Sequence, residues 1–286
     1  MNSIIAGVLN LAILTIGQDF IKNLNDIPAV LQAPIVQEGA PRPGIRVRQQ
    51  WPEEAGTEIH HALYLPAGEI TADGLPVIVE FAGNGGFKNQ LGDESDGTVE
   101  GCLLGYGITK GKGAIWVCMP FVDRENKRNA ANWWGDVDAT VEYTIRTVER
   151  VCKQYGGDRK RVFLAGFSRG SIACTYVGLR NEKIAGLWSG FICHSHLDGV
   201  RKWNYADSDA RSALSRWARL NNRPVFISHE GSAQAARDFL ETNKVQGRFT
   251  FVNLPFPNHT AAWVLRDLPE TKQLRDWWGK QARLVD

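Results

Sequence analysis

The chain has 286 residues, of which 43% are hydrophobic and 22% are charged. These proportions are typical of a globular protein and exclude a disordered chain, a collagen-like repeat and a coiled coil. Lysine and arginine total 33 against 31 aspartate and glutamate residues, which leaves a formal charge of +2. Because no run of like charges is present, we expect no nucleic-acid partner.

The first eighteen residues carry no charged side chain, and residues 4–16 form an apolar stretch. This stretch is too short to cross a bilayer as a helix, so we expect no membrane partner. Thr15-Ile16-Gly17 offers small residues for a cleavage site before Gln18, which predicts a signal peptide over residues 1–17 and a secreted or periplasmic protein. The alternative is an N-terminal helix packed on a cytoplasmic protein.

The five cysteines show neither a C-x-x-C motif nor the spacing of zinc ligands. Each lies in an apolar setting, which favours buried, unpaired thiols over a disulfide framework, and one disulfide is the alternative. His194 and His196 form an H-x-H pair, but no third histidine or cysteine is spaced to join them. We therefore expect no metal. The cysteines are Cys102, Cys118, Cys152, Cys174 and Cys193.

Residues 18–44 contain four prolines and predict an irregular leader along the surface of the domain. Strand-like runs at 45–50 and 58–65 flank a turn and predict an antiparallel edge hairpin. Strands and helices then alternate, which is typical of a parallel sheet. The expected strands are 76–81, 114–119, 161–166, 184–192, 224–228 and 249–254, and the expected helices are 136–155, 169–179, 208–220, 233–242 and a last one from about 260.

This series predicts an α/β fold: about eight strands in one mostly parallel sheet, with helices on both faces. No repeat, low-complexity tract or long linker interrupts it, so residues 18–286 are expected to form one domain. The longest insertion, residues 194–223, has room only for a small cap over the sheet.

A G-x-S-x-G motif, Gly166 to Gly170, lies between a predicted strand and a predicted helix. A strand that reverses sharply into a helix crowds the backbone on both sides of the serine, so only glycine fits there. The turn would expose the hydroxyl of Ser168 as a nucleophile, and the backbone N–H of Arg169 would face an oxyanion formed there. The alternative is an ordinary turn without catalytic function.

A serine nucleophile needs a base within hydrogen-bond reach, and His259 follows the last predicted strand in a loop stiffened by Pro255 and Pro257. The alternative for His259 is a helix cap. The acid partner is less evident, because Ala233 stands where an aspartate is usual. Glu230 is the one carboxylate in that turn and is our first candidate, with Asp198 as the second. A simple helix cap is the other reading of Glu230.

The glycine-rich stretch Gly83 to Gly86 follows the predicted strand 76–81, and the backbone N–H of Asn84 or a neighbouring glycine is expected as a second oxyanion donor. The stretch has neither a following Lys-Ser/Thr pair nor a G-x-G-x-x-G frame with a downstream acid. We therefore expect no nucleotide or other cofactor.

With these motifs, the sequence resembles the α/β-hydrolase superfamily from about Ile45 onward. Asn132-Trp-Trp-Gly-Asp-Val-Asp and Gly157-Asp-Arg-Lys-Arg-Val-Phe-Leu-Ala-Gly-Phe-Ser-Arg-Gly are similar to motifs of feruloyl esterases, acetyl-xylan esterases and polyhydroxybutyrate-depolymerase-like esterases. Two features depart from that pattern: Ser171 replaces a second glycine, and the usual acid is absent. The resemblance implies ester hydrolysis through an acyl-enzyme.

Ten tryptophans are unusually many, and Trp133 and Trp134 fall in a loop expected at the carboxyl-end rim, where open α/β sheets bind ligands. With Trp203 they predict binding of a short or aromatic acyl ester of a polar alcohol, for example a small-molecule or polysaccharide-linked ester. Core packing is the alternative for each one. A peptidase of the prolyl-oligopeptidase type, a lipase and a catalytically degenerate binding protein are the other functions considered.

Overall fold

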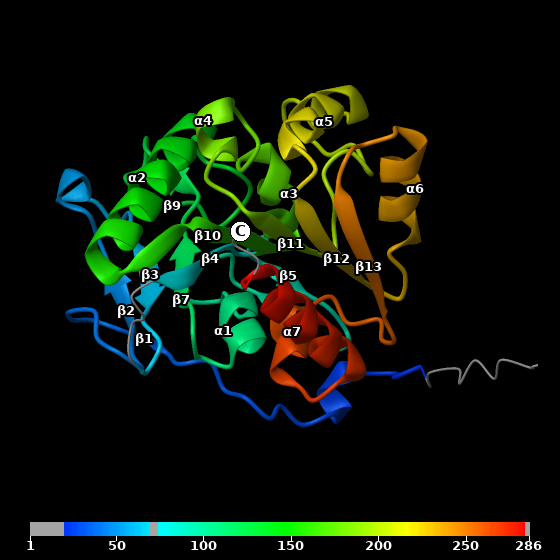
Figure 1. The fold of residues 1–286 in the computed structure, drawn as a ribbon, viewed down its shortest axis with the longest axis horizontal. Coiled ribbons are helices and arrows are strands. Elements are labelled where there is room, and N and C mark those ends of the chain that lie inside the picture. The colour runs from blue at the N-terminus through cyan, green and yellow to red at the C-terminus, as the bar shows by residue number, and fades with distance from the viewer. Residues whose placement is uncertain (1–19, 69–73, 284–286) are drawn as a thin grey trace, which may run out of the picture.

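The computed structural model describes residues 20–68 and 74–283, and strands from most of this length join one nine-stranded sheet (Figure 1). β2 and β3 pair antiparallel, as do β3 and β7, and every other pair in this sheet is parallel. The predicted signal peptide, residues 1–17, lies outside the described residues. The strands in spatial order are β1 (Val36–Gln37), β2 (Arg46–Gln49), β3 (His61–Tyr64), β7 (Ile115–Met119), β4 (Leu75–Phe81), β10 (Gly157–Phe167), β11 (Gly190–His194), β12 (Pro224–Glu230) and β13 (Arg248–Leu254).

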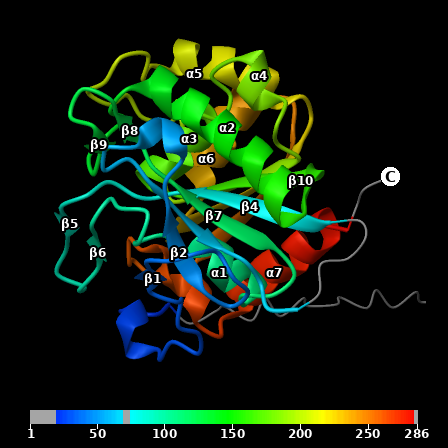
Figure 2. The same cartoon turned by 90° about the vertical axis from the view of Figure 1, so that its left-hand side faces the viewer.

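Helices cover both faces of the sheet, as expected for a parallel sheet whose two faces are both apolar (Figures 1 and 2). Alternate residues of β4 enter two separate hydrophobic clusters: Val77 and Val79 contribute to one and Ile78 to the other. One face carries α2 (Val137–Tyr155), α3 (Arg169–Tyr176), α4 (Glu182–Ala185), α5 (Ala210–Trp217) and α6 (Gln234–Thr242), and the other carries α1 (Leu104–Thr109) and α7 (Pro269–Gln281).

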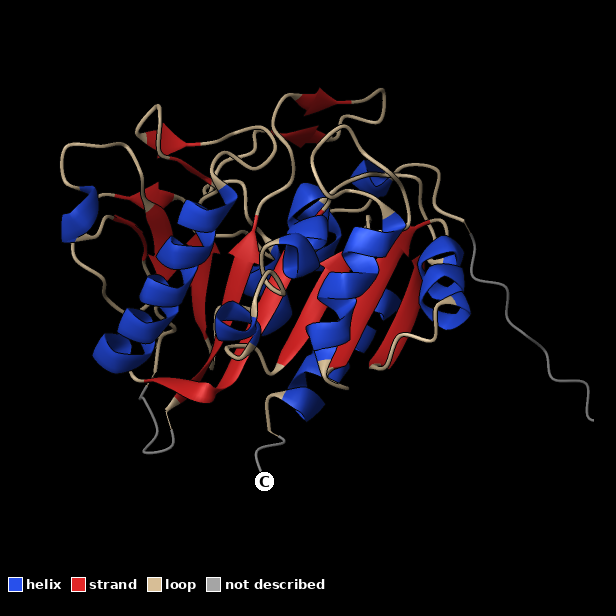
Figure 3. Ribbon diagram, turned by 90° about the horizontal axis from the view of Figure 1, so that it is seen from above, coloured by secondary structure: helices blue, strands red, loops and turns tan. Residues whose placement is uncertain are grey.

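Short elements extend beyond the carboxyl ends of the central strands (Figure 3). They include the two-stranded hairpins β5 (Phe87–Lys88) with β6 (Glu94–Ser95) and β8 (Val122–Asp123) with β9 (Arg128–Asn129). The 3₁₀ helices are η1 (Leu24–Asp26), η2 (Pro52–Glu54), η3 (Ala218–Leu220) and η4 (Ala261–Leu265). No helix among the described residues has the length and apolar character needed to cross a membrane.

The structure corrects two predicted elements. The expected strand 184–192 is instead α4 followed by β11, because Asn181 caps the backbone N–H of Ile184 and Gly186 ends the short helix. The expected last helix from about residue 260 is η4 followed by α7, which begins at Pro269, a residue suited to the first helical position. The antiparallel pairing of β2 with β3 and the buried, free state of all five cysteines are confirmed, but this hairpin is not the edge of the sheet, because β1 from the expected irregular leader pairs with β2.

Candidate active site

The turn between β10 and α3 places Ser168 in a strained conformation, with φ +53° and ψ −113°. The two glycines of the motif permit this turn. A Cβ on Gly166 would lie 2.0 Å from the carbonyl oxygen of Gly170, and one on Gly170 would lie 1.9 Å from that of Phe81. The backbone N–H of Ser168 donates to the carbonyl of His194 on the neighbouring strand at 2.9 Å, which ties the turn to the sheet.

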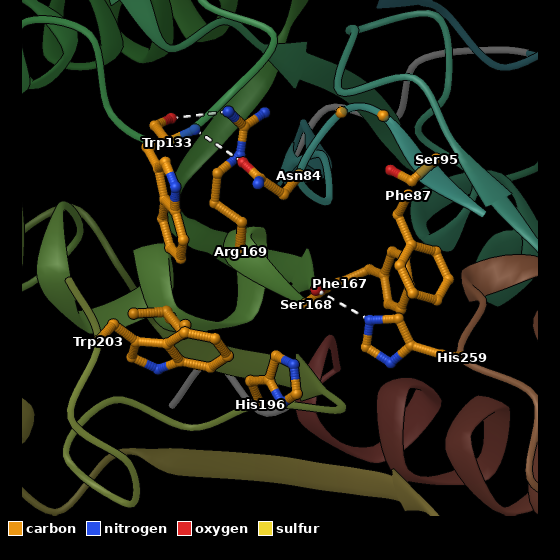
Figure 4. A pocket seen from close by; sticks show the side chains of 13 residues that line it. Asn84, Phe87, Ser95, Trp133, Phe167, Ser168, Arg169, His196, Trp203 and His259 are labelled. Carbon is orange, nitrogen blue, oxygen red and sulfur yellow. Dashed lines mark hydrogen bonds between the residues drawn. The ribbon is translucent and has the colours of Figure 1, made fainter. Parts of the chain in front are cut away.

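Ser168, His259 and Glu230 form a continuous hydrogen-bonded chain at the carboxyl ends of the strands, and Figure 4 shows its Ser168–His259 part. Ser168 Oγ lies 3.0 Å from His259 Nε2, the geometry of a hydroxyl that donates to the ring. On the other side of the ring, His259 Nδ1 lies 2.5 Å from Glu230 Oε1. This arrangement can accept a proton from the serine and stabilise the imidazolium that results.

Glu230 occupies a mixed electrostatic environment. Burial by itself would favour the neutral acid, but the hydrogen bond from His259 holds the pKa of Glu230 well below its usual range. Burial lowers the pKa of His194 and of His196 to about 4 each, so both rings are neutral at pH 7. Glu230 is therefore a carboxylate beside rings that carry no competing charge.

Asp198, the other acid considered, has a different role. Its carboxylate is buried and accepts from Arg216 Nε at 2.8 Å and from Arg216 Nη2 at 3.0 Å. The hydroxyl of Thr175 donates to the same group at 2.8 Å. These contacts hold the loop after β11 against α3 and α5. Within the part of the chain that the structure describes, no hydrogen bond or ion pair joins Asp198 to His259.

Ser195, which the sequence analysis did not single out, contacts both partners in this chain. Its Oγ lies 2.9 Å from Glu230 Oε1 and 3.0 Å from His259 Nδ1. Ser195 directly follows β11, the neighbour of β12 in the sheet. The sequence signal that could have suggested Ser195 is its position shortly after a predicted strand, where site residues of a parallel sheet are expected.

Buried side chains hold the loop that carries His259 in place through hydrogen bonds. Asp93 Oδ2 accepts the backbone N–H of His259 at 2.9 Å, and Asp93 Oδ1 accepts from Asn258 Nδ2 at 2.8 Å. Asn258 in turn accepts the backbone N–H of Leu24 at 2.6 Å and donates to Asn23 at 3.0 Å. The N-terminal leader thus contacts the residue next to His259.

Asn84 and Arg169, the two expected oxyanion donors, both line the hollow next to Ser168 (Figure 4). Arg169 is the first residue of α3, so its N–H has no acceptor within the helix. The side chain of Asn84 accepts the backbone N–H of Trp133 at 2.7 Å, which holds the glycine-rich loop against the tryptophan loop.

The guanidinium of Arg169 is buried and donates to the backbone carbonyls of Trp133 at 2.6 Å, Gly97 at 3.1 Å and Ala130 at 3.3 Å. It also lies over the ring of Phe121. Burial lowers the pKa of Arg169 to about 9. The side chain of Arg169 therefore joins the loop between β9 and α2 to the loop between β6 and α1 beside the site.

The hollow has a volume of about 340 Å³ and largely apolar walls. Trp133 and Trp203 lie on one side in an edge-to-face contact, with ring centroids 5.7 Å apart, while Phe87 and Phe167 pack on His259 with centroids 4.9 and 4.8 Å from its ring. The lining residues are Asn84, Gly85, Gly86, Phe87, Ser95, Trp133, Phe167, Ser168, Arg169, Ile172, His196, Trp203 and His259.

Trp134, which was expected to contact substrate, does not line this hollow. It is 5% exposed and packs between Phe121, Tyr176 and Tyr205 in the core. Trp203 takes its expected place on the rim instead. The side chains of these two adjacent tryptophans point in different directions. Trp133, whose φ is +49°, is the one that faces the hollow.

A cluster of possible metal donors lies away from this hollow, where ligand atoms of Glu80, Cys102 and Cys118 come within 4.8 Å of one another. The carboxylate of Glu80 already accepts the N–H groups of Leu103, Leu104, Gly105 and the Trp116 ring at 2.8 to 2.9 Å. Arg46 Nη2 lies 3.0 Å from the sulfur of Cys118. A carboxylate occupied by four donors beside a cation is poorly suited to bind a metal.

No protein-family model and no curated protein matches the sequence. Solved structures resemble the fold. A fungal esterase from Rhizomucor miehei is 15% identical with a TM-score of 0.52, over 82% of this chain and 84% of that one. A hyperthermophilic esterase from the archaeon Pyrobaculum calidifontis is 15% identical with a TM-score of 0.51, over 85% of this chain and 86% of that one.

Carboxyl esterase 2 from the mycorrhizal fungus Tuber melanosporum is 15% identical with a TM-score of 0.50, over 80% of this chain and 83% of that one. The chain spans 62% of the length of a thermostable esterase that it also resembles, with a TM-score of 0.49. At these identities the likeness concerns architecture, not substrate. The sheet order, the turn at Ser168 and the likenesses with TM-scores of 0.50 to 0.52 together show that the chain has the α/β-hydrolase fold.

Proposed function

We propose that the protein is a serine hydrolase that cleaves carboxylic esters through an acyl-enzyme. The observation that carries this proposal is the hydrogen-bonded chain from Ser168 through His259 to Glu230, which opens onto a 340 Å³ hollow. A serine at a strained strand-to-helix turn with a histidine at 3.0 Å has the arrangement of an activated nucleophile. The resemblance of the fold to solved esterases is consistent with this chemistry.

In this proposal Ser168 Oγ attacks the ester carbonyl and transfers its proton to His259 Nε2. The backbone N–H groups of Asn84 and Arg169 bind the oxyanion, a contribution of about 3 to 4 kcal/mol per donor in serine hydrolases. His259 then returns the proton to the departing alcohol. Water, deprotonated by His259, hydrolyses the acyl-enzyme, and Glu230 stabilises the imidazolium in both steps.

The walls of the hollow support a short or aromatic acyl group. Trp133 and Trp203 present aromatic faces on one side, and Ile172 adds apolar surface. A second hollow of about 410 Å³ shares Phe87 and Ser95 with the first and includes Lys88 and Glu94. Charged and polar groups there suit a polar alcohol such as a sugar more than a lipid chain.

Two measurements test the proposal. A fluorophosphonate probe should label the wild-type protein and not Ser168→Ala, because labelling requires an activated hydroxyl. Hydrolysis of p-nitrophenyl esters should fall by about 10³-fold or more in Ser168→Ala and His259→Ala while both variants stay folded. A wild-type protein that is neither labelled nor active would point to a binding protein, and cleavage of peptide amides in preference to esters would point to a peptidase.

A further inference from the structure

We propose that Ser195 is a positioning residue for the base, a fourth member of the chain Ser168–His259–Glu230. This inference rests on the proposed function and extends it. Ser195 Oγ is within hydrogen-bond distance of both Glu230 Oε1, at 2.9 Å, and His259 Nδ1, at 3.0 Å. Its side chain therefore bridges the acid and the base, whose own contact is 2.5 Å.

The hydrogen atoms in this triangle can be assigned in one consistent way. Nδ1 of His259 carries a hydrogen both when Nε2 accepts from Ser168 and when the ring is an imidazolium, so it can donate to Glu230 and to Ser195. The hydroxyl of Ser195 then donates to Glu230, which as a carboxylate only accepts. The hydroxyl oxygen faces the developing cation and its hydrogen faces the anion.

Glu230 has reason to need such a partner. A glutamate has one more rotatable bond than an aspartate, so its carboxylate is harder to hold in one orientation. In the described residues Oε1 takes both hydrogen bonds, while Oε2 is buried and has no hydrogen-bond partner. Ser195 is thus the hydrogen-bond donor, other than His259 itself, that fixes the orientation of the Glu230 side chain.

The backbone of Ser195 gives a second, independent reason. Its φ is +80°, a conformation that favours glycine and that costs a serine free energy. The backbone N–H donates to the carbonyl of Ser228 at 2.8 Å, which holds the residue in place at the end of β11. A glycine would meet the same backbone requirement without strain, so the hydroxyl is what the strained serine adds.

Ser195 should also affect the pH dependence of the reaction. A hydrogen bond to the charged form of a group favours that form, so the oxygen of Ser195 stabilises the imidazolium of His259. Loss of the hydroxyl should move the acid limb of kcat/KM to lower pH. Substitution of Ser195 leaves the other charged or titratable groups around the His259 ring in place. These groups are Glu230 and His229 on β12, His194 at the end of β11, His196 after it, and Asp93, which binds the backbone of His259.

The test compares Ser195→Gly, Ser195→Ala and the wild type on a p-nitrophenyl ester. A hydrogen bond to a charged group is lost in both variants, so we expect kcat to fall roughly ten- to a hundred-fold with KM unchanged and the acid limb at lower pH. Ser195→Gly should keep its melting temperature within a few degrees, since relief of backbone strain offsets the lost hydrogen bonds. Ser228→Ala is the matched control, because this buried hydroxyl contacts His194 and neither Glu230 nor His259.

The possible failures are distinct. Wild-type kcat and an unchanged pH profile in Ser195→Gly would overturn the role of Ser195 while leaving the proposed esterase intact. Full activity in Ser195→Gly with a loss only in Ser195→Ala would also overturn it, because the backbone and not the hydroxyl would then matter. An inactive wild-type protein, or an active Ser168→Ala, would instead refute the proposed function itself.

Discussion

The carboxylate of Asp93 accepts the backbone N–H of His259 at 2.9 Å, although 166 residues separate them in the chain. Asp93 is 3% exposed, and its second oxygen accepts from Asn258. Because both oxygens serve donors of the histidine loop, the position of the candidate base depends on a side chain in the loop between β5 and β6.

Asp93→Asn should therefore impair both stability and turnover. The carboxylate accepts from Asn89, Asn258 and His259, whereas the amide has only one acceptor oxygen, so at least one of these donors loses its partner, at a cost of about 1 to 3 kcal/mol. We expect a lower melting temperature and a lower kcat with little change in KM, measured by thermal unfolding and steady-state kinetics. Asp238→Asn, an exposed change on α6, is the control and should alter neither.

Amide substitutions of the two candidate acids should have different effects, one on turnover and the other on stability. Glu230→Gln replaces the carboxylate beside His259 with a neutral amide, which no longer stabilises the imidazolium and can favour the wrong tautomer of the ring, so kcat should fall by about 10²-fold or more at nearly unchanged stability. Asp198→Asn weakens a buried pair with Arg216 and should mainly lower the free energy of unfolding. Urea denaturation and kinetics on both variants distinguish them, and a larger loss of kcat in Asp198→Asn would contradict the assignment of Glu230.

Substitution of Trp133 should affect substrate binding, whereas substitution of the adjacent Trp134 should affect stability. Trp133→Ala removes a wall of the hollow and should raise KM for acetyl or feruloyl esters, while the fold persists. Trp134→Ala leaves a core cavity and should cost about 3 to 5 kcal/mol of stability. Kinetics on esters of increasing acyl length check the substrate side, and faster hydrolysis of long-chain than of acetyl or feruloyl esters would exclude the proposed specificity.

His61 predicts acid sensitivity of the fold. This ring is fully buried on β3, and burial lowers its pKa to about 3, below the ordinary value near 6.5. Between these values the unfolded chain binds a proton that the folded chain does not, so the stabilising effect is complete above pH 6.5 and is lost progressively as pH falls toward 3. Thermal unfolding between pH 7 and pH 4 should show a shallower loss in His61→Gln than in the wild type.

His60→Gln provides the comparison, since the neighbouring ring is only partly buried and contacts Glu100. It should leave the steep loss of stability caused by His61 in place. Equal pH profiles for His61→Gln and the wild type would show that the buried ring does not contribute to acid unfolding.

Local sequence was sufficient for the features that depend on neighbours along the chain. The alternation of apolar runs predicted the parallel sheet, and the two glycines around Ser168 predicted its turn, because crowding at that turn is a property of five consecutive residues. The position of His259 after the last strand followed from chain order. The same local reasoning failed at residues 184–192, where the cap from Asn181 outweighed an apolar run typical of a strand.

Tertiary structure decided the features that depend on side chains from different strands. Glu230 ends β12 and Asp198 follows β11, but Arg216 on α5 binds Asp198 and leaves Glu230 to His259. Trp133 and Trp134 are adjacent, yet Phe121 and Tyr176 pack on Trp134 and bury it, while Trp133 faces the hollow. Ser195 contacts the acid and base only because β11 lies beside β12, and such distances of a few ångströms between strand ends depend on packing that no local pattern encodes.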